Sequence, residues 1–310
     1  MRPVLVIGES LIDIVDRGDG TEPVRHVGGS PLNVAFGLGR LDIPTVFATE
    51  FGDDADGEAI ARHLASAGVR IERSDDGVRP TATAIARIGA DGSAEYVFDL
   101  DWTFTRPPQP TGLAAVHIGS IGALRTPGSQ KVIGFVEALP DDVLVTFDPN
   151  IRPALVPPRD DTRDLVERYA ARAGIVKLSD EDAEWLYPGR ADAVAQILLE
   201  RGARLVAVTR GAEGSTLHTA SATVDVPARP TRPVDTIGAG DAFMAGLLAA
   251  VVGGGGVQDV LDGGLTPADL SAIGRIAAVA ASITVSRAGA MPPTAAELER
   301  HVQEPYVSAV

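Results

Sequence analysis

The sequence contains no cysteine, little positive charge and no long hydrophobic run, and each absence excludes a class of function. Without cysteine there are no disulfides, no thiolate metal ligands and no cysteine nucleophile. The formal net charge of −15, from 42 acidic and 27 basic residues, argues against binding to the phosphates of DNA or RNA. The chain also lacks a basic amphipathic helix for an anionic membrane, and no uninterrupted apolar run reaches membrane-spanning length.

The first nine residues, MRPVLVIGE, lack the charged segment and the long apolar segment of a secretory signal. With 310 residues and 45% hydrophobic content, the chain is long enough to bury a substantial core. We therefore expect a cytoplasmic protein whose partners are small molecules, and neither nucleic acid nor membrane.

Short apolar, β-branched runs alternate along the chain with segments of helical periodicity. The runs predicted as strands are 4–8, 45–52, 116–120, 143–150, 174–179 and 204–211, and the helical segments include 32–42, 57–68, 161–173 and 191–202. This alternation predicts an α/β fold: one domain over residues 1–310, built on a doubly wound, mostly parallel sheet flanked by helices. Ligands of such a sheet bind beyond the carboxyl ends of its strands.

Two segments in the N-terminal third depart from this alternation. Residues 13–27 and 81–100 each contain an Asp-Gly pair, Asp19–Gly20 and Asp91–Gly92, between extended stretches, which is typical of a β-hairpin. The two hairpins are either ordinary surface features or a small β-sheet lid, formed by 14–27 and 81–104, over one end of the main domain.

Residues 235–250 read DTIGAGDAFMAGLLAA, in which an apolar helical run starts behind a glycine-rich turn. Gly238, Ala239 and Gly240 present backbone N–H groups at the start of this helix, where they and the helix dipole favour an anion. Asp241 would repel a bound phosphate. It fits the site if it accepts a proton from an attacking hydroxyl while the amides stabilise a phosphoryl group in transfer. The segment is neither a P-loop nor a dinucleotide fingerprint, because Lys-Ser/Thr and the third glycine are absent.

Polar residues near the N-terminus could bind a polyol. The strand in VIGESLIDIV is followed by Asp13, whose carboxylate can accept hydrogen bonds from hydroxyls. In GGSPLNVAFGLGRL, Gly28 and Gly29 permit close backbone approach, and Asn33 offers both a donor and an acceptor. Taken singly, each of these residues is also explained by ordinary turn or surface chemistry.

Two further strands end in polar or glycine-containing turns. In VTFDPNIRP the residues Asp148, Asn150 and Arg152 follow a strand, and the planar guanidinium of Arg152 suits a phosphate or carboxylate. The stretch VAVTRGAEGS could line a nucleotide's phosphates or ribose with Thr209, Gly211 and Gly214.

Taken together, these stretches resemble the ribokinase-like (PfkB) carbohydrate kinases, most closely the bacterial fructokinase type. The resemblance covers nearly the whole chain, in order, with GESLID, GGSPLNVA, the two lid segments, DPNIRP, KLSDEDAEWL, VTRGAEG, DTIGAGDAF and VSRAGA. It implies a ribokinase-like fold with a small β-sheet lid, and ATP-dependent phosphorylation of a primary hydroxyl of a sugar.

The resemblance also implies a role for each matching residue. Asp241 is the base, and Gly238, Ala239 and Gly240 form the anion hole for the γ-phosphate, with Arg152 near the transferred group. The residues implied in sugar binding are Asp13, Gly28, Gly29, Asn33 and Asn150. Those implied in nucleotide binding are Lys177, Ser179, Thr209, Gly211, Gly214, Ala278 and Ser282.

Two cations are implied by the resemblance. Asp235 and the carbonyl of Ile237 match the positions that bind K⁺. The family's Asn-x-x-Glu, which organises Mg²⁺ through water, reads Ser179-Asp180-Glu181-Asp182 here. Asp182 is one methylene shorter than glutamate, so either Asp182 or Glu181 takes that role.

The resemblance favours fructose as the acceptor. Alternatives on the same fold are 2-keto-3-deoxygluconate, ribose or a nucleoside. A non-catalytic sensor is disfavoured because Asp241 and the glycines are intact, and an NAD-dependent enzyme because no early G-x-G-x-x-G occurs. Alternating strands on a small protruding sheet could also pair with a second copy, so we predict a homodimer through the lid.

Overall fold

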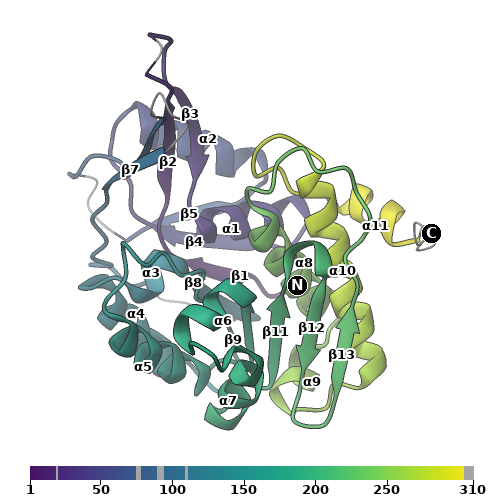
Figure 1. Cartoon of the computed structure of the whole chain (residues 1–310). Helices are drawn as coiled ribbons and strands as arrows, with labels where there is room; N and C mark the ends of the chain where they lie inside the picture. Colours follow the sequence, from purple (N-terminus) through teal and green to yellow (C-terminus); the bar gives the residue numbers. More distant parts are fainter. Residues whose placement is uncertain (19, 75–77, 89–93, 109–110, 304–310) are drawn as a thin grey trace.

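A nine-stranded sheet forms the centre of the protein in the computed structural model, which describes residues 1–18, 20–74, 78–88, 94–108 and 111–303 (Figure 1). Its strand order is β13-β12-β11-β10-β9-β8-β1-β4-β5. The strands are β1 (Val4–Ile7), β4 (Thr45–Thr49), β5 (Arg70–Arg73), β8 (Ala115–Gly119), β9 (Leu144–Asp148), β10 (Ile175–Ser179), β11 (Leu205–Thr209), β12 (Ser215–His218) and β13 (Thr223–Val226).

The strands from β11 across to β5 are parallel, and at one edge β12 pairs antiparallel with both β11 and β13. Strands β1, β4, β8 and β9 are buried along their whole length, because helices cover both faces of the sheet. Successive residues of β1 pack into different cores: Val4 and Val6 lie in one, Leu5 and Ile7 in the other. The predicted doubly wound α/β fold is therefore confirmed.

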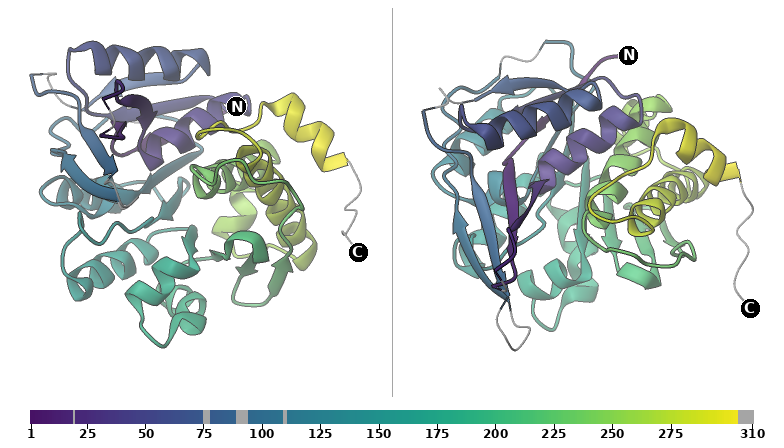
Figure 2. Two further views of the ribbon diagram at one scale, coloured as in Figure 1. Left: turned by 45° about the horizontal axis from the view of Figure 1, so that its top comes forward. Right: turned by 90° about the horizontal axis from the view of Figure 1, so that it is seen from above.

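Two sets of helices cover the two faces of the sheet. One face carries α1 (Ser30–Arg40), α2 (Ala55–Ser66), α8 (Ala239–Gly253), α9 (Val257–Leu261) and α10 (Pro267–Val285). The other carries α3 (Ser120–Leu124), α4 (Gly128–Glu137), α5 (Arg159–Ala170), α6 (Asp180–Leu186) and α7 (Val194–Arg201). The last helix, α11 (Ala295–Gln303), lies beside α10 at the outer edge of the molecule (Figures 1 and 2).

Helix α10 is long and apolar enough, by length and composition alone, to cross a membrane. Half of it is buried, and it packs against α8 and strands β12 and β13. This packing accounts for its apolar sequence, since a helix in the core of a large domain is hydrophobic nearly all round.

A second, four-stranded sheet lies apart from the first and protrudes at the top of Figure 1. Its order is β3-β2-β6-β7, with β2 (Leu11–Asp16), β3 (Val24–Gly28), β6 (Thr83–Ile88) and β7 (Ala94–Asp99). Both expected hairpins are present, because β2 pairs antiparallel with β3 and β6 with β7. Asp19 and the pair Asp91–Gly92 lie outside the described residues. Since β2 starts four residues after β1 ends, the small sheet stands at the carboxyl edge of the large one.

Candidate active site

Two adjoining cavities open at the carboxyl ends of the parallel strands. The first, of about 570 Å³, is lined by residues that follow β1, β8 and β9 and by the start of α8, including Glu9, Asp13, Gly29, Ser30, Asn33, Ser120 and Ile237 to Asp241. The second, of about 490 Å³, is lined by residues at the ends of β10 and β11 and just after them, including Lys177, Ser179, Glu181, Asp182, Thr209 and Gly211. Asn150, Arg152 and Gly240 line both cavities, so the two adjoin at the start of α8.

Helix α8 begins at this boundary without a side-chain cap. Its N-cap residue, Gly238, has a φ of 74°, in the left-handed region that favours glycine. The amide of Ala239 donates to the Thr236 carbonyl at 3.2 Å. Within the described part of the chain, the amides of Gly238, Gly240 and Asp241 have no hydrogen-bonded partner. The start of α8 therefore offers free N–H groups and the positive end of a helix dipole to an anion.

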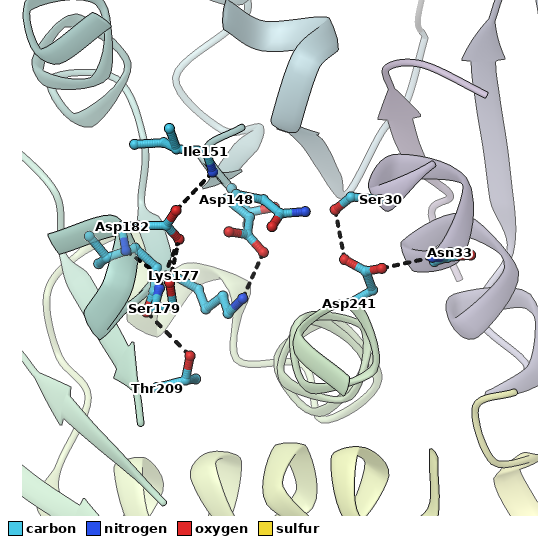
Figure 3. A network of polar contacts seen from close by, with 12 residues as sticks. Ser30, Asn33, Asp148, Ile151, Lys177, Ser179, Asp182, Thr209 and Asp241 are labelled. Atoms are coloured by element: carbon cyan, nitrogen blue, oxygen red, sulfur yellow. Dashed lines mark hydrogen bonds and ion pairs between the residues drawn. The ribbon is translucent and has the colours of Figure 1, made fainter. Parts of the chain in front are cut away.

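The carboxylate of Asp241 is held by two side chains of α1 (Figure 3). Ser30 Oγ donates to Oδ1 at 2.7 Å, and Asn33 Nδ2 donates to Oδ2 at 2.8 Å. Burial raises the pKa of Asp241, while the hydrogen bonds from Ser30 and Asn33 and the positive charges of Lys177 and Arg152 oppose the rise. The group is therefore a buried carboxylate with raised basicity, as a general base requires.

A buried ion pair lies on the other side of the α8 start. Lys177 Nζ, on β10, donates to Asp148 Oδ2, on β9, at 2.9 Å, and both side chains are at most 5% exposed. Burial alone would lower the pKa of Lys177, but the carboxylates of Asp148, Asp182 and Asp241 outweigh it and keep the ammonium charged. Burial raises the pKa of Asp148 to about 6, against the effect of Lys177.

The Lys177 ammonium also faces the helix start. A Cβ added at Gly240 would come within 3.0 Å of Lys177 Nζ, and both residues line the second cavity. An anion bound at the α8 amides would therefore contact a buried cation as well, which strengthens the interaction because little water screens it.

Asp182 occupies the third position of α6 and forms a reciprocal capping box with Ser179. Ser179 Oγ and N donate to Asp182 Oδ2 at 2.8 and 3.0 Å, and the Ile151 amide donates to Oδ1 at 2.8 Å. Three of the roughly four lone-pair positions of this carboxylate are thus occupied within the protein. The side chain of Glu181 lies at the same cavity and has no hydrogen-bonded partner among the residues described.

The other residues implied in sugar binding lie around the first cavity. Asp13 lines it from β2, and burial raises the pKa of this carboxyl against the charges of His26 and Arg152. Gly28 packs on Asp13, since an added Cβ there would come within 2.1 Å of its Oδ2. Asn150 has a φ of 35°, and its Oδ1 accepts a hydrogen bond from Arg152 Nη1 at 2.9 Å.

Asp235 lies just before α8 and ties two loops together. Its Oδ1 accepts from the Ile237 amide at 3.0 Å, and its Oδ2 accepts from the Gly289 amide at 2.9 Å. These amide hydrogen bonds lower the pKa of Asp235, so the group is a carboxylate at neutral pH. No group of three or more histidine, aspartate or glutamate side chains in the described ranges is arranged to hold a metal ion by itself.

Three residues implied in nucleotide binding do not line either cavity. Gly214 has a φ of 97° and lies in the tight turn between β11 and β12, where an added Cβ would come within 2.3 Å of the Val226 carbonyl. Ala278 and Ser282 are buried in α10, and Ser282 Oγ donates to the Val279 carbonyl at 2.9 Å.

The structure also brings in residues that the sequence did not single out. Ser30 stands in the quoted GGSPLNVA, three residues before Asn33, which is the spacing that places two side chains on one helix face. Glu9, in GESLID, lines the first cavity, and its Oε2 accepts from the Gly122 amide at 2.8 Å. Burial raises the pKa of Glu9 to about 7. Phe98, from the small sheet, completes the wall.

Known proteins resemble this chain in sequence and in fold over most of its length. A family model described as pfkB family carbohydrate kinase matches residues 1–297. A fructokinase of Rhizobium leguminosarum bv. trifolii is 34% identical over 261 residues, which are 80% of this chain and 79% of that protein. A fructokinase of Klebsiella pneumoniae is 32% identical over 267 residues, with 81% and 85% covered. A crystal structure of fructokinase with bound ATP from Xylella fastidiosa has a TM-score of 0.84 at 26% identity, over 97% of this chain and 98% of that chain.

Proposed function

The chain belongs to the pfkB family of carbohydrate kinases, and on that premise we propose that it transfers the γ-phosphoryl group of ATP to a primary hydroxyl of fructose. The proteins that it resembles at 34% and 32% identity are fructokinases, and a structural neighbour at 26% identity carries ATP. The observation that carries the proposal is the position of Asp241, at the boundary of two adjoining cavities and next to unpaired amides.

In the proposed reaction the two cavities hold the two substrates. The sugar occupies the first, where Asp13, Gly29, Asn33 and Asn150 offer partners for its hydroxyls. The triphosphate occupies the second and extends to the α8 start, beside Thr209, Gly211 and Lys177. The small sheet covers the sugar and excludes water, which would otherwise receive the phosphoryl group.

Asp241 then accepts the proton of the attacking hydroxyl as the new O–P bond forms. The bond between the γ-phosphorus and the β–γ bridging oxygen breaks, and ADP leaves with the electron pair. The amides of Gly238 and Gly240 and the Lys177 ammonium stabilise the charge on the transferred group, and Ala239 joins them by exchanging the Thr236 carbonyl for a phosphoryl oxygen. Arg152, which lines both cavities, contacts the transferred group from the opposite side.

Residues at the second cavity and just before α8 would also hold two cations, Mg²⁺ and K⁺. Mg²⁺ in kinases is held mostly by phosphate oxygens and water with one or two carboxylates, and it neutralises charge on the phosphates when bound. We assign the protein carboxylate to Glu181, because Asp182 is largely occupied as a cap. Asp235 and the Ile237 carbonyl would hold K⁺, and the positive charge of this ion would stabilise the loop that leads into α8.

A coupled assay of ADP release with fructose, ribose, 2-keto-3-deoxygluconate and a nucleoside tests the acceptor. We expect the highest kcat/KM with fructose, by at least about tenfold, since a site that pairs specific hydroxyls discriminates strongly against analogues. A kcat/KM for ribose equal to that for fructose would refute fructose as the substrate and leave the kinase assignment intact.

We also propose a homodimer that forms through the small sheet, in the cytoplasm, where ATP is abundant. Val24 on β3 and Val97 on β7 are 44% and 37% exposed on the two edge strands, and exposed apolar edges favour pairing with another copy. Light scattering that gives only the monomer mass would exclude the dimer.

A further inference from the structure

Two helices converge on the base from opposite ends of the chain. Ser30 and Asn33 lie in the first turns of α1, and Asp241 lies in the first turn of α8, 211 and 208 residues away. Each donor takes a different oxygen of the carboxylate (Figure 3). Asn33 is buried, whereas Ser30 is partly exposed to the first cavity.

The first turn of α1 is fixed against the end of β1. A Cβ added at Gly29 would come within 2.7 Å of the Glu9 carbonyl, and one added at Gly8 within 2.3 Å of Pro31 Cγ. This close packing leaves Ser30 little freedom to move relative to the cavity, because tightly packed elements transmit displacement instead of absorbing it.

A small-residue contact sets the distance between the two helices. One turn beyond the Asn33–Asp241 hydrogen bond, a Cβ added at Gly37 would come within 2.8 Å of Ala245 Cβ. The two contacts are spaced by four residues on each helix, so α1 and α8 run side by side in the same direction at this point. Close approach of the backbones lets the short Ser30 side chain reach the carboxylate.

We propose that Ser30 is a positioning residue for the base: its hydroxyl fixes one oxygen of the Asp241 carboxylate so that a free lone pair faces the acceptor hydroxyl. Each carboxylate oxygen has about two acceptor positions, so one remains on each after the bonds from Ser30 and Asn33. The inference rests on the proposed function, since it assigns a role within the same phosphoryl transfer.

The hydrogen bond from Ser30 also stabilises the charged form of the Asp241 carboxylate. The neighbouring α1 offers Asp241 only the neutral Ser30 and Asn33, and the charged groups come from the other side: Lys177 from β10 and Arg152 from the loop after β9 favour its ionisation, and Glu9 and Asp148 disfavour it when they are charged. If the Ser30 hydroxyl is lost, the pKa of Asp241 rises further. A base with a higher pKa is protonated at higher pH, so activity on the acid side is lost earlier.

Kinetics of Ser30→Ala and Ser30→Thr across pH 5 to 9 test the proposal. We expect kcat of Ser30→Ala to fall about tenfold, with the KM for sugar within about twofold, and the acid limb of kcat to move up by about one pH unit. Ser30→Thr keeps a hydroxyl and should recover most of kcat and the original limb. The matched control is Ser129→Ala, because Ser129 is a buried first-turn serine of α4 whose hydroxyl has no hydrogen-bonded partner in the described part of the chain.

A titration of the free protein by NMR, with ¹³C-labelled aspartate and Asp241→Asn for assignment, gives the pKa of Asp241 without any substrate. Wild-type activity on fructose tests the proposed function, whereas this titration tests Ser30 alone. An unchanged pKa in Ser30→Ala, or a raised KM with kcat and the acid limb unchanged, would overturn the proposal and make Ser30 a sugar ligand or a bystander.

Discussion

Helices α8 and α10 both place an aspartate at their third position, and the two aspartates have opposite environments. In α10, Asp269 Oδ2 accepts from the Thr266 Oγ1 and N at 2.6 and 2.9 Å in a reciprocal capping box, which lowers the pKa of Asp269. In α8 the N-cap is Gly238, which has no side chain to offer, and burial raises the pKa of Asp241.

The difference shows what a glycine N-cap does at this site. A serine or threonine N-cap directs the third-position acid back to its own helix start, as also happens in α6 with Ser179 and Asp182. A glycine leaves the acid free to face another helix and leaves the helix amides free for a ligand. Whether such an aspartate caps its own helix or is free to act as a base therefore depends more on the N-cap residue than on the aspartate itself.

Replacing each aspartate by asparagine is the most direct test of the difference between Asp241 and Asp269. We expect Asp241→Asn to lower kcat by roughly 10²–10⁴-fold, the usual value of general-base assistance, while ATP still binds. Asp269→Asn should keep kcat within about twofold and slightly lower the free energy of unfolding, because it weakens a cap. Steady-state kinetics and urea unfolding of both variants provide the measurements.

Asp241→Asn should also unfold at a higher temperature than wild type, since it removes a buried charge whose pKa is raised. A gain in stability with a loss of activity is typical of catalytic groups. If Asp241→Asn retained a near-normal kcat, its environment would have to be regarded as structural, like that of Asp269.

The second comparison is between the buried ion pair of Lys177 and Asp148, beside the α8 start, and an exposed ion pair on the protein surface. Lys177→Met leaves the Asp148 carboxyl buried without its partner, and we expect the free energy of unfolding to fall by about 3–5 kcal/mol. Adding Asp148→Asn should restore part of this stability and none of the activity. The control is Arg168→Met at the exposed pair with Glu137, which should cost about 1 kcal/mol or less. Equal losses at the two pairs would show that the burial of Lys177 has no energetic consequence.

A third comparison tests the open space in front of α8. In Gly240→Ala the new methyl group would meet Lys177 Nζ at 3.0 Å, so we expect kcat/KM for ATP to fall by about tenfold or more while the fold is retained. Gly134→Ala in α4 is the matched control, because an added Cβ there meets nothing within 4 Å. That variant should be fully active and slightly more stable, by about 0.5–1 kcal/mol, as alanine favours a helix. The same kcat/KM for ATP in both variants would count against an anion site at Gly240.

The smallest effect is expected at Glu9, which lines the first cavity together with Asp241 and is also a buried acid. Its pKa is raised from 4.5 to about 7, so the native state binds a proton that the unfolded state has released between these values. Stability of the wild type therefore falls as pH rises from about 4.5 through 7. We expect Glu9→Gln to match wild type at pH 4.5 and to exceed it by about 1–2 kcal/mol at pH 8, in urea unfolding at each pH. A difference independent of pH would show that Glu9 is not the titrating group.

The sequence predicted those parts that depend on local patterns. The parallel strands β1, β4, β8, β9, β10 and β11 read as apolar runs, whereas the charged β5 did not. DTIGAGDAF pointed to Asp241 and the amides at the start of α8, because the glycines and the acid are neighbours in the chain. The short, partly polar strands β12 and β13 gave no such signal.

Contacts between segments that are far apart in the chain leave no local pattern in the sequence. Ser30 could be paired with Asp241 only after α1 and α8 were placed side by side, and Lys177 with Asp148 only after β9 and β10 were known to be neighbours. Glu9 required the burial of its carboxylate to be known, because an acid after a strand is ordinarily exposed.

The pairing of α1 with α8 also has a consequence for how the protein is made. A growing chain on the ribosome completes α1 some two hundred residues before α8 is synthesised. Until then the chain has the sugar-side residues but no base and no amides at which a γ-phosphate could react. The groups of α1 and those of the α8 start therefore come together only when the first and last quarters of the polypeptide have folded against each other.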